Sequence, residues 1–127
     1  MSKEQLPISP HLQIYKPQIT SILSIAHRIT GFSLNFLLIL VLLWITALTH
    51  GEKTYEIFIN FIFFFPVRII VFFSILGFSY HMLNGIRHMF WDLGYFIENK
   101  SAAILGYLIL IISLSLTFFL SVFLGLF

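Results

Sequence analysis

Three long stretches of this chain contain almost no charged residues, and few folds accommodate such a chain. Ser101 to Phe127 has no charged side chain, and Ile29 to Thr49 has none either. About 20 apolar helical residues cross the hydrocarbon core of a bilayer. Only 9% of the 127 residues are charged, and 59% are hydrophobic, whereas soluble domains carry roughly 25% charged residues. The sequence therefore predicts an all-α membrane protein.

The middle apolar stretch, Ile57 to Ile86, is longer than one upright span requires, and Pro66 and Arg68 interrupt it. Proline fits the first turn of a helix, where its missing N–H leaves no bond unmade. We therefore expect the second span to begin near Pro66, and Ile57 to Phe65 to form an outer segment. The predicted organisation is a polar segment over 1–20 and a bundle of three transmembrane helices over 21–127. The expected spans are about 25–49, 66–91 and 102–126.

Lys and Arg residues are unevenly distributed between the two ends of these spans. Five fall on one side, and Lys53 and Arg68 fall on the other. Cationic segments stay preferentially in the cytoplasm or the mitochondrial matrix. We therefore expect the N-terminus on that side of a bacterial cytoplasmic or mitochondrial inner membrane. The net charge of +2 is too small to indicate nucleic-acid binding. The five cations are Lys3, Lys16, Arg28, Arg87 and Lys100.

The middle span carries small and polar residues at spacings of three and four, so they share one helical face. His81 lies about six residues, or roughly 9 Å, deeper in the membrane than Arg87. At that depth an imidazole needs a hydrogen-bond partner or a metal ion. The chain has no Cys, so a metal or redox centre must rely on His or on partner chains. The face consists of Ser74, Gly77, Phe78, His81, Asn84, Gly85 and His88.

Haem b suits such a face, because neutral imidazole is a common axial ligand of haem iron. Gly77 and Gly85, one turn to either side of His81, would leave space for a flat ring. No other His lies at the depth of His81, so the second axial ligand would come from a partner subunit. From the residues alone, the alternative is close helix packing with His81 bonded to a neighbour.

A second polar cluster lies near the start of the first span. Ser24, Arg28 and Gly31 share a face, and His27 is adjacent to it. A quinone headgroup needs donors to its carbonyl oxygens; Ser24 offers a hydroxyl and Arg28 a fixed positive charge. The alternative is that Ser21 or Ser24 caps the helix and Arg28 anchors it at the membrane edge.

Three blocks of the sequence match a known family, in the family's order and at compatible distances. Together they resemble the cytochrome b subunit of succinate dehydrogenase, the larger of the two membrane anchors of respiratory complex II. The resemblance covers nearly the whole chain, although the third span matches only in being apolar. The blocks are Ser9–Tyr15, Ser24–Gly31, and Tyr80–His81 with Asn84–His88 and Trp91–Gly94.

The resemblance implies roles for particular residues in binding two redox molecules. His81 matches the axial ligand of one haem b, which is shared with the smaller anchor subunit. Ser24 and Arg28 match positions that line the ubiquinone pocket, completed by the iron–sulfur subunit and the smaller anchor.

Four further residues match positions around the haem. His27 and His88 match histidines near the haem propionates, and Arg87 lies beside them. Asp92 matches an acidic position nearby, which we expect to pair with Arg28 or Arg87.

The resemblance also implies a division of labour within a larger enzyme. Succinate would be oxidised at a flavin in the flavoprotein subunit, and iron–sulfur clusters would pass the electrons to ubiquinone beside this chain. The chain alone would perform no chemistry. Three alternatives stay open: the anchor of a fumarate reductase, a small channel or transporter, and a structural anchor in which His81 only packs.

Overall fold

The computed structural model describes residues 16–127, and in this part of the chain there are helices and no strand. Most of the predicted polar segment therefore lies outside the described residues. Three of the four helices are long and apolar enough to cross a bilayer, in agreement with the predicted all-α membrane protein. The helices are α1 (Ile19–Thr49), α2 (Glu52–Phe63), α3 (Phe65–Asp92) and α4 (Asn99–Phe123).

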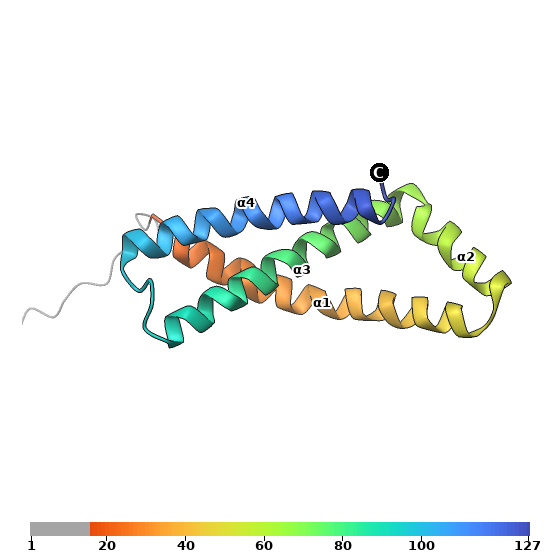
Figure 1. Ribbon diagram of the computed structural model, residues 1–127, viewed down its shortest axis with the longest axis horizontal. Coiled ribbons are helices and arrows are strands. Elements are labelled where there is room, and N and C mark those ends of the chain that lie inside the picture. Colours follow the sequence, from red (N-terminus) through yellow and green to blue (C-terminus); the bar gives the residue numbers. More distant parts are fainter. Residues whose placement is uncertain (1–15) are drawn as a thin grey trace, which may run out of the picture.

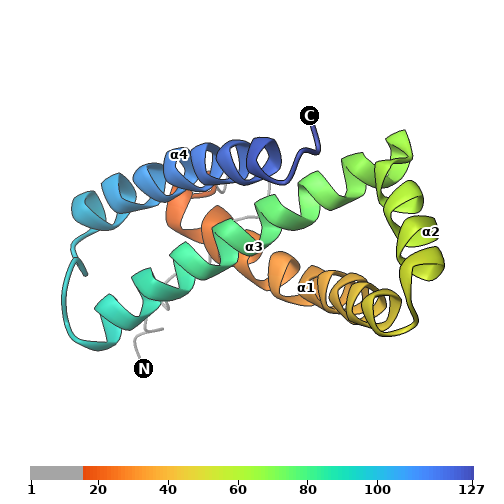
Figure 2. The same cartoon turned by 45° about the vertical axis from the view of Figure 1, so that its right-hand side comes forward.

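The three long helices form an elongated bundle in which α3 is central (Figure 1). Helix α3 packs along α4 and crosses α1, whereas α1 and α4 touch over a shorter region. Figure 2 shows α1 and α3 diverging beyond their crossing, with α2 joining their separated ends. The crossing of α1 and α3 therefore brings the two predicted polar clusters to the same part of the molecule.

The predicted outer segment is helix α2, which begins five residues earlier than Ile57. Glu52 lies in its first turn, where a carboxylate stabilises the positive end of the helix dipole. Helix α3 then begins at Phe65 and carries Pro66 in its first turn. This is where the sequence placed the start of the second span.

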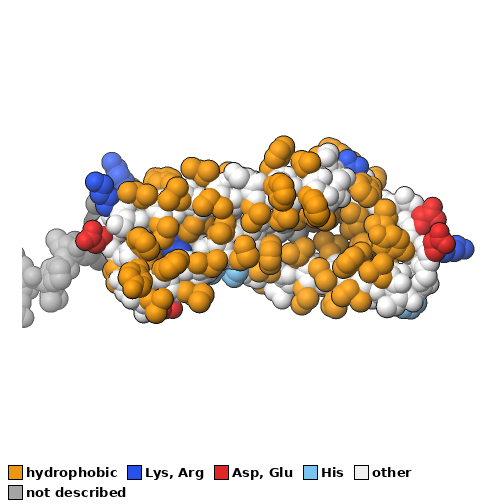
Figure 3. Space-filling model, viewed as in Figure 1, with side chains coloured by type: hydrophobic (Ala, Val, Ile, Leu, Met, Phe, Trp, Pro, Cys, Tyr) orange, Lys and Arg blue, Asp and Glu red, His pale blue; other side chains and the backbone are white. Residues whose placement is uncertain are grey.

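Most apolar side chains lie on the outside of the bundle. Phe32 is 71% exposed and Phe118 is 67% exposed, and both belong to spanning helices. Figure 3 shows hydrophobic side chains along the length of the bundle, with the charged groups mainly at its two ends. A soluble protein of this size would not expose so large a contiguous apolar surface. The surface is therefore suited to lipid and to the apolar helices of partner subunits.

Helix α4 faces α3 with a row of small buried side chains. Hydroxyls in this row bond within their own helix: Thr117 Oγ1 donates to the Ser113 carbonyl at 2.6 Å, and Ser121 Oγ donates to the Thr117 carbonyl at 2.8 Å. Small residues let membrane helices approach closely. The small residues of the row are Ala102, Gly106, Ser113, Thr117 and Ser121, and the larger Ile109 is buried among them.

Candidate functional site at the histidine cluster

Three histidines predicted as site residues form a stack between α1 and α3. His27 of α1 lies nearly parallel to His81 of α3, with ring centroids 3.9 Å apart and planes inclined by 8°. The His27 ring also faces His88, at 5.1 Å and 24°. His81 and His88 are seven residues apart and so lie on one face of α3. The structure thus joins histidines from both predicted clusters.

The hydrogen bond at His81 determines which ring nitrogen is free. Nδ1 lies 3.1 Å from the His27 carbonyl oxygen and 3.4 Å from Oγ1 of Thr30. A carbonyl oxygen only accepts, so Nδ1 carries the proton and Nε2 carries a lone pair. Within residues 16–127, Nε2 has no hydrogen-bond partner, so its lone pair can bind a metal ion.

Thr30 supports this arrangement and was not singled out by the sequence analysis. Its hydroxyl donates to carbonyls of its own helix, at 2.9 Å from Ala26 and 3.0 Å from His27. Because the hydroxyl hydrogen points toward these carbonyls, a lone pair of the Thr30 oxygen faces His81 Nδ1. Thr30 could have been found from its spacing of three residues from His27, because this spacing places both side chains on the same side of α1.

Gly31 allows the His81 ring to lie against α1. A Cβ atom at this position would be 2.9 Å from His81 Cε1. The two glycines predicted to flank a bound ring instead face α1. A Cβ on Gly77 would meet the Ser33 hydroxyl at 3.4 Å, and one on Gly85 would meet His27 at 3.9 Å. Helix α1 therefore occupies the space in which we expected a flat ring to lie.

Arg87 is 1% exposed and joins α3 to the start of α4. One terminal nitrogen, Nη2, donates to the Ala102 carbonyl at 2.8 Å, and the other, Nη1, donates to Asn84 Oδ1 at 3.2 Å. The guanidinium also lies over the Trp91 ring, with its carbon 4.1 Å from the centroid. Arg87 therefore fixes the connection between α3 and α4.

The expected ion pair of Asp92 is absent from the described part of the chain. Asp92 is exposed, and Arg87 donates its two hydrogen bonds to a backbone carbonyl and an amide oxygen instead. An exposed carboxylate at the end of α3 is solvated, whereas Arg87 points into the bundle. The two groups therefore face different surroundings, although they are five residues apart.

Ser24 and Arg28 lie one turn apart on α1. Ser24 is half-buried and Arg28 is exposed, and neither side chain has a hydrogen-bond partner within residues 16–127. The adjacent Leu23 is fully buried, and its carbonyl accepts a 2.7 Å hydrogen bond from the Tyr80 hydroxyl. The backbone beside Ser24 is thus fixed to α3. Tyr80 adjoins His81 in the sequence, and no role was predicted for it.

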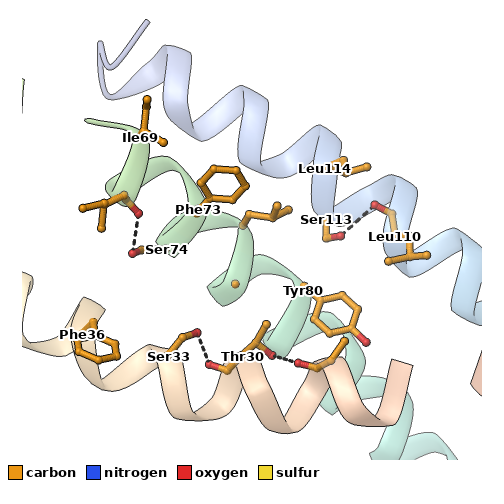
Figure 4. Close-up of a pocket in the computed structure, with 14 residues that line it drawn as sticks. Thr30, Ser33, Phe36, Ile69, Phe73, Ser74, Tyr80, Leu110, Ser113 and Leu114 are labelled. Carbon is orange, nitrogen blue, oxygen red and sulfur yellow. Dashed lines mark hydrogen bonds between the residues drawn. The ribbon is translucent and has the colours of Figure 1, made fainter. Parts of the chain in front are cut away.

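An apolar groove of about 610 Å³ lies between α1, α3 and α4. Thr30 and Tyr80 are at one end of it, and Phe36 and Ile69 are toward the other (Figure 4). The serine hydroxyls labelled in the groove donate to carbonyls in their own helices, at 2.8 Å for Ser33 and 2.9 Å for Ser113. The groove therefore presents a largely apolar surface, which does not favour a path for ions.

The histidines do not converge on one point. Among the described residues there is no group of three or more His, Asp or Glu side chains arranged to hold a metal ion. His81 itself would give a metal one ligand, the Nε2 nitrogen that its hydrogen bond leaves free. That is the number a haem iron takes from a single subunit when its two axial ligands come from different chains.

The fold and this site define an α-helical integral membrane protein with a histidine cluster between two spanning helices. Residues 2–120 match the model of the succinate dehydrogenase/fumarate reductase transmembrane subunit family. The chain belongs to this family, among the cytochrome b subunits of succinate dehydrogenase. It is a protein of a bacterial cytoplasmic or mitochondrial inner membrane.

Named relatives cover most of the chain. The succinate dehydrogenase cytochrome b556 subunit of Rickettsia prowazekii is 40% identical, over 87% of this chain and 86% of the relative. The cytochrome b560 subunit of Marchantia polymorpha is 44% identical, over 72% and 71%. That of Reclinomonas americana is 40% identical, over 82% and 76%.

Proposed function

We propose that this chain is the membrane-anchor subunit of a succinate dehydrogenase, binding haem b and helping to form the ubiquinone-reduction site. The observation that carries this proposal is the orientation of His81. Its Nδ1 donates a hydrogen bond to the His27 carbonyl oxygen at 3.1 Å, and the lone pair of its Nε2 has no partner in the described chain. Metal-binding histidines are commonly fixed in this way by a hydrogen bond from the other ring nitrogen.

The surroundings of His81 fit a haem that is shared with a second subunit. His27 Nδ1 is buried and has no hydrogen-bond partner in the described chain, as expected of a group that a ligand or partner subunit satisfies. His27 and His88 are the candidates to hold the propionates. Arg87 has both terminal nitrogens engaged, whereas its buried Nε has no partner in the described chain, so we assign it a nearby positive charge with one donor left for a ligand or a partner subunit. The haem, when bound, carries single electrons.

Ser24 and Arg28 are the residues that we assign to the quinone. Both offer donors with no partner in the described part of the chain, and charge-assisted donors are strong ligands for a carbonyl oxygen that gains negative charge. Arg28 is exposed on this chain, so other subunits must form the remaining walls of the site. In this proposal, the iron–sulfur subunit and the smaller anchor subunit form those walls.

The proposal places this chain beneath two soluble subunits. The flavoprotein subunit oxidises succinate, and the iron–sulfur subunit delivers electrons to the quinone. The N-terminus and the loop between α3 and α4 face the cytoplasm or matrix, because most Lys and Arg residues lie on that side. Ser24 and Arg28 then lie at the membrane edge nearest the soluble subunits.

An absorption spectrum of the purified complex tests the haem assignment. In the reduced-minus-oxidised spectrum we expect His81→Ala to remove the b-type band. His50→Ala is the matched control, because His50 is exposed at the other end of α1, where its Nδ1 also bonds a carbonyl. An unchanged band in a His81→Ala complex that retains all its subunits would falsify the assignment.

Two activities of the same complex test the quinone assignment. Losing a charge-assisted hydrogen bond costs about 1.5–3 kcal/mol, or roughly 10- to 150-fold in rate. We expect a decrease of this size in ubiquinone reduction for Ser24→Ala and Arg28→Leu, with succinate oxidation by a soluble dye preserved. Ser115→Ala, on the exposed face of α4, should change neither activity. Parallel loss of both activities in Ser24→Ala counts against the assignment.

Fumarate reduction is the second candidate activity, because the matching family model includes fumarate reductase subunits. The two directions differ in rate and not in the residues of this chain. Comparing succinate oxidation with fumarate reduction in the purified complex decides between them.

A further inference from the structure

Asn84, Arg87 and His88 form a continuous hydrogen-bonded series along one side of α3. Asn84 is fully buried, and it lies between the other two. Its Oδ1 is 3.2 Å from Arg87 Nη1, and its Nδ2 is 3.2 Å from His88 Nε2. His27 lies between this series and His81, because its ring faces both His88 and His81.

The guanidinium determines which way the Asn84 amide faces. An arginine side chain only donates hydrogen bonds, so the group that faces Arg87 must be the amide oxygen. Arg87 cannot turn away, because Nη2 is held by the Ala102 carbonyl at 2.8 Å and the group is buried against Trp91. The amide NH₂ group must therefore face His88.

The orientation of Asn84 in turn determines the protonation of His88. An amide NH₂ group only donates, so His88 Nε2 must accept and must carry no proton. A ring protonated on Nε2 would oppose two donors at 3.2 Å. His27 and Trp91 face the His88 ring with their own rings and offer Nε2 no alternative acceptor in the described residues. The proton of a neutral His88 therefore lies on Nδ1.

We propose that Asn84, oriented by Arg87, is a positioning residue that fixes His88 as the neutral tautomer protonated on Nδ1. His88 then presents one free donor, Nδ1–H, and no free acceptor. Such a ring suits a ligand oxygen with no proton, such as a carboxylate. The identification of that carboxylate as a haem propionate rests on the proposed function, whereas the tautomer itself depends only on three residues of this chain.

Nitrogen NMR of the full-length chain tests the tautomer without haem. The chain, labelled with ¹⁵N-histidine and reconstituted in lipid nanodiscs, gives a spectrum in which His88 is assigned by its loss in His88→Gln. We expect a protonated Nδ1 and an unprotonated Nε2. A protonated Nε2 in the unaltered chain overturns the proposal, whether or not the complex later proves to hold haem.

Asn84→Asp tests the role of Asn84 directly. A carboxylate accepts from both Arg87 and His88, so we expect Nε2 of His88 to become protonated. A purely structural role for Asn84 would not move this signal. Asn60→Asp is the matched control, since Asn60 is exposed on α2, and it should leave His88 unchanged. Retention of an unprotonated Nε2 in Asn84→Asp overturns the proposal, and the measurement on the unaltered chain stands if this variant does not fold.

Discussion

The His81 imidazole rests directly on the backbone of α1, and a single missing side chain makes this contact possible. With no Cβ at Gly31, the ring comes close enough for Nδ1 to reach the His27 carbonyl at 3.1 Å. That hydrogen bond leaves Nε2 free to bind a metal ion. The geometry of Gly31 is therefore part of the proposed haem site, although Gly31 itself offers no ligand.

Gly31→Ala should weaken haem retention, because its methyl group would lie 2.9 Å from His81 Cε1. Overpacking of this kind typically costs about 1–3 kcal/mol, which corresponds to roughly 5- to 150-fold in affinity. The measurement is the b-type absorbance per complex after extended washing. Gly85→Ala is the matched control: its Cβ would lie 3.9 Å from His27, an ordinary contact, and the haem content should stay near that of the unaltered complex. Equal losses in the two variants would contradict this account.

The residue types of the site could be predicted from the sequence, but their contacts could not. The spacing of three and four on the middle span pointed to His81 and His88. The hydrogen bond from His81 to a backbone carbonyl depends on where α1 crosses α3, and the spacing of residues in the sequence does not indicate this point. Arg87 shows the same limit: it was predicted at the membrane edge beside an anionic group, and it is buried between helices.

At the scale of the helices, Leu23 holds α1 against both of its neighbours. Its side chain is 1% exposed and packs with Tyr80 and Ile109. It also fills the space left by Gly106 on α4, where an added Cβ would lie 2.5 Å from Leu23 Cδ1. Leu23 adjoins Ser24, so the packing of three helices positions the proposed quinone ligand.

Gly106→Ala and Leu23→Ala should show strong coupling in a double-mutant cycle. Each change alone should destabilise the chain, by about 1–3 kcal/mol for the overpacked Gly106→Ala and about 2–5 kcal/mol for Leu23→Ala. Together they should cost less than the sum, because the smaller side chain at position 23 makes room for the added methyl group. The measurement is unfolding of the purified chain in detergent.

Leu42→Ala serves as the control for this cycle, because it lies at an exposed position of the same helix. It should change stability little and should add independently to Gly106→Ala. Simple additivity of Leu23→Ala with Gly106→Ala would show that the two positions are not in contact.

Helix ends show how far the sequence could locate the elements. The third span was expected over about 102–126, whereas α4 runs from Asn99 to Phe123. Gly125 ends it with a φ of 66°, and Leu126 N–H bonds back to the Ser121 carbonyl at 2.9 Å. This is the usual helix end with a left-handed glycine. Hydropathy continues past this glycine, so an apolar count alone does not locate the end of the helix.

At the scale of the whole molecule, groups of the proposed sites lie near the surface of the bundle, where partner subunits can complete them. Arg28 is exposed, and His81 Nε2 has no partner in the described chain. The apolar exterior must meet lipid or the helices of another subunit. The composition predicted this class of surface. It could not identify which parts are covered by partners, because lipid and an apolar helix select the same residue types.

Single cysteines should reveal which way the bundle is inserted, because the chain has no Cys of its own. Lys53→Cys lies in α2, and Glu98→Cys lies just before α4. With the N-terminus in the cytoplasm or matrix, a membrane-impermeant maleimide added to the outer face should label position 53 only. Both positions should react after permeabilisation. Labelling of position 98 alone before permeabilisation would reverse the proposed orientation.

We propose that His81 binds a haem iron through Nε2. Anomalous diffraction at the iron absorption edge, from crystals of the intact complex, locates this iron directly. We expect an iron peak within coordination distance of His81 Nε2, with the other axial ligand from a second subunit. An intact complex with no iron peak beside His81, and with Nε2 hydrogen-bonded to a neighbouring group instead, would contradict it.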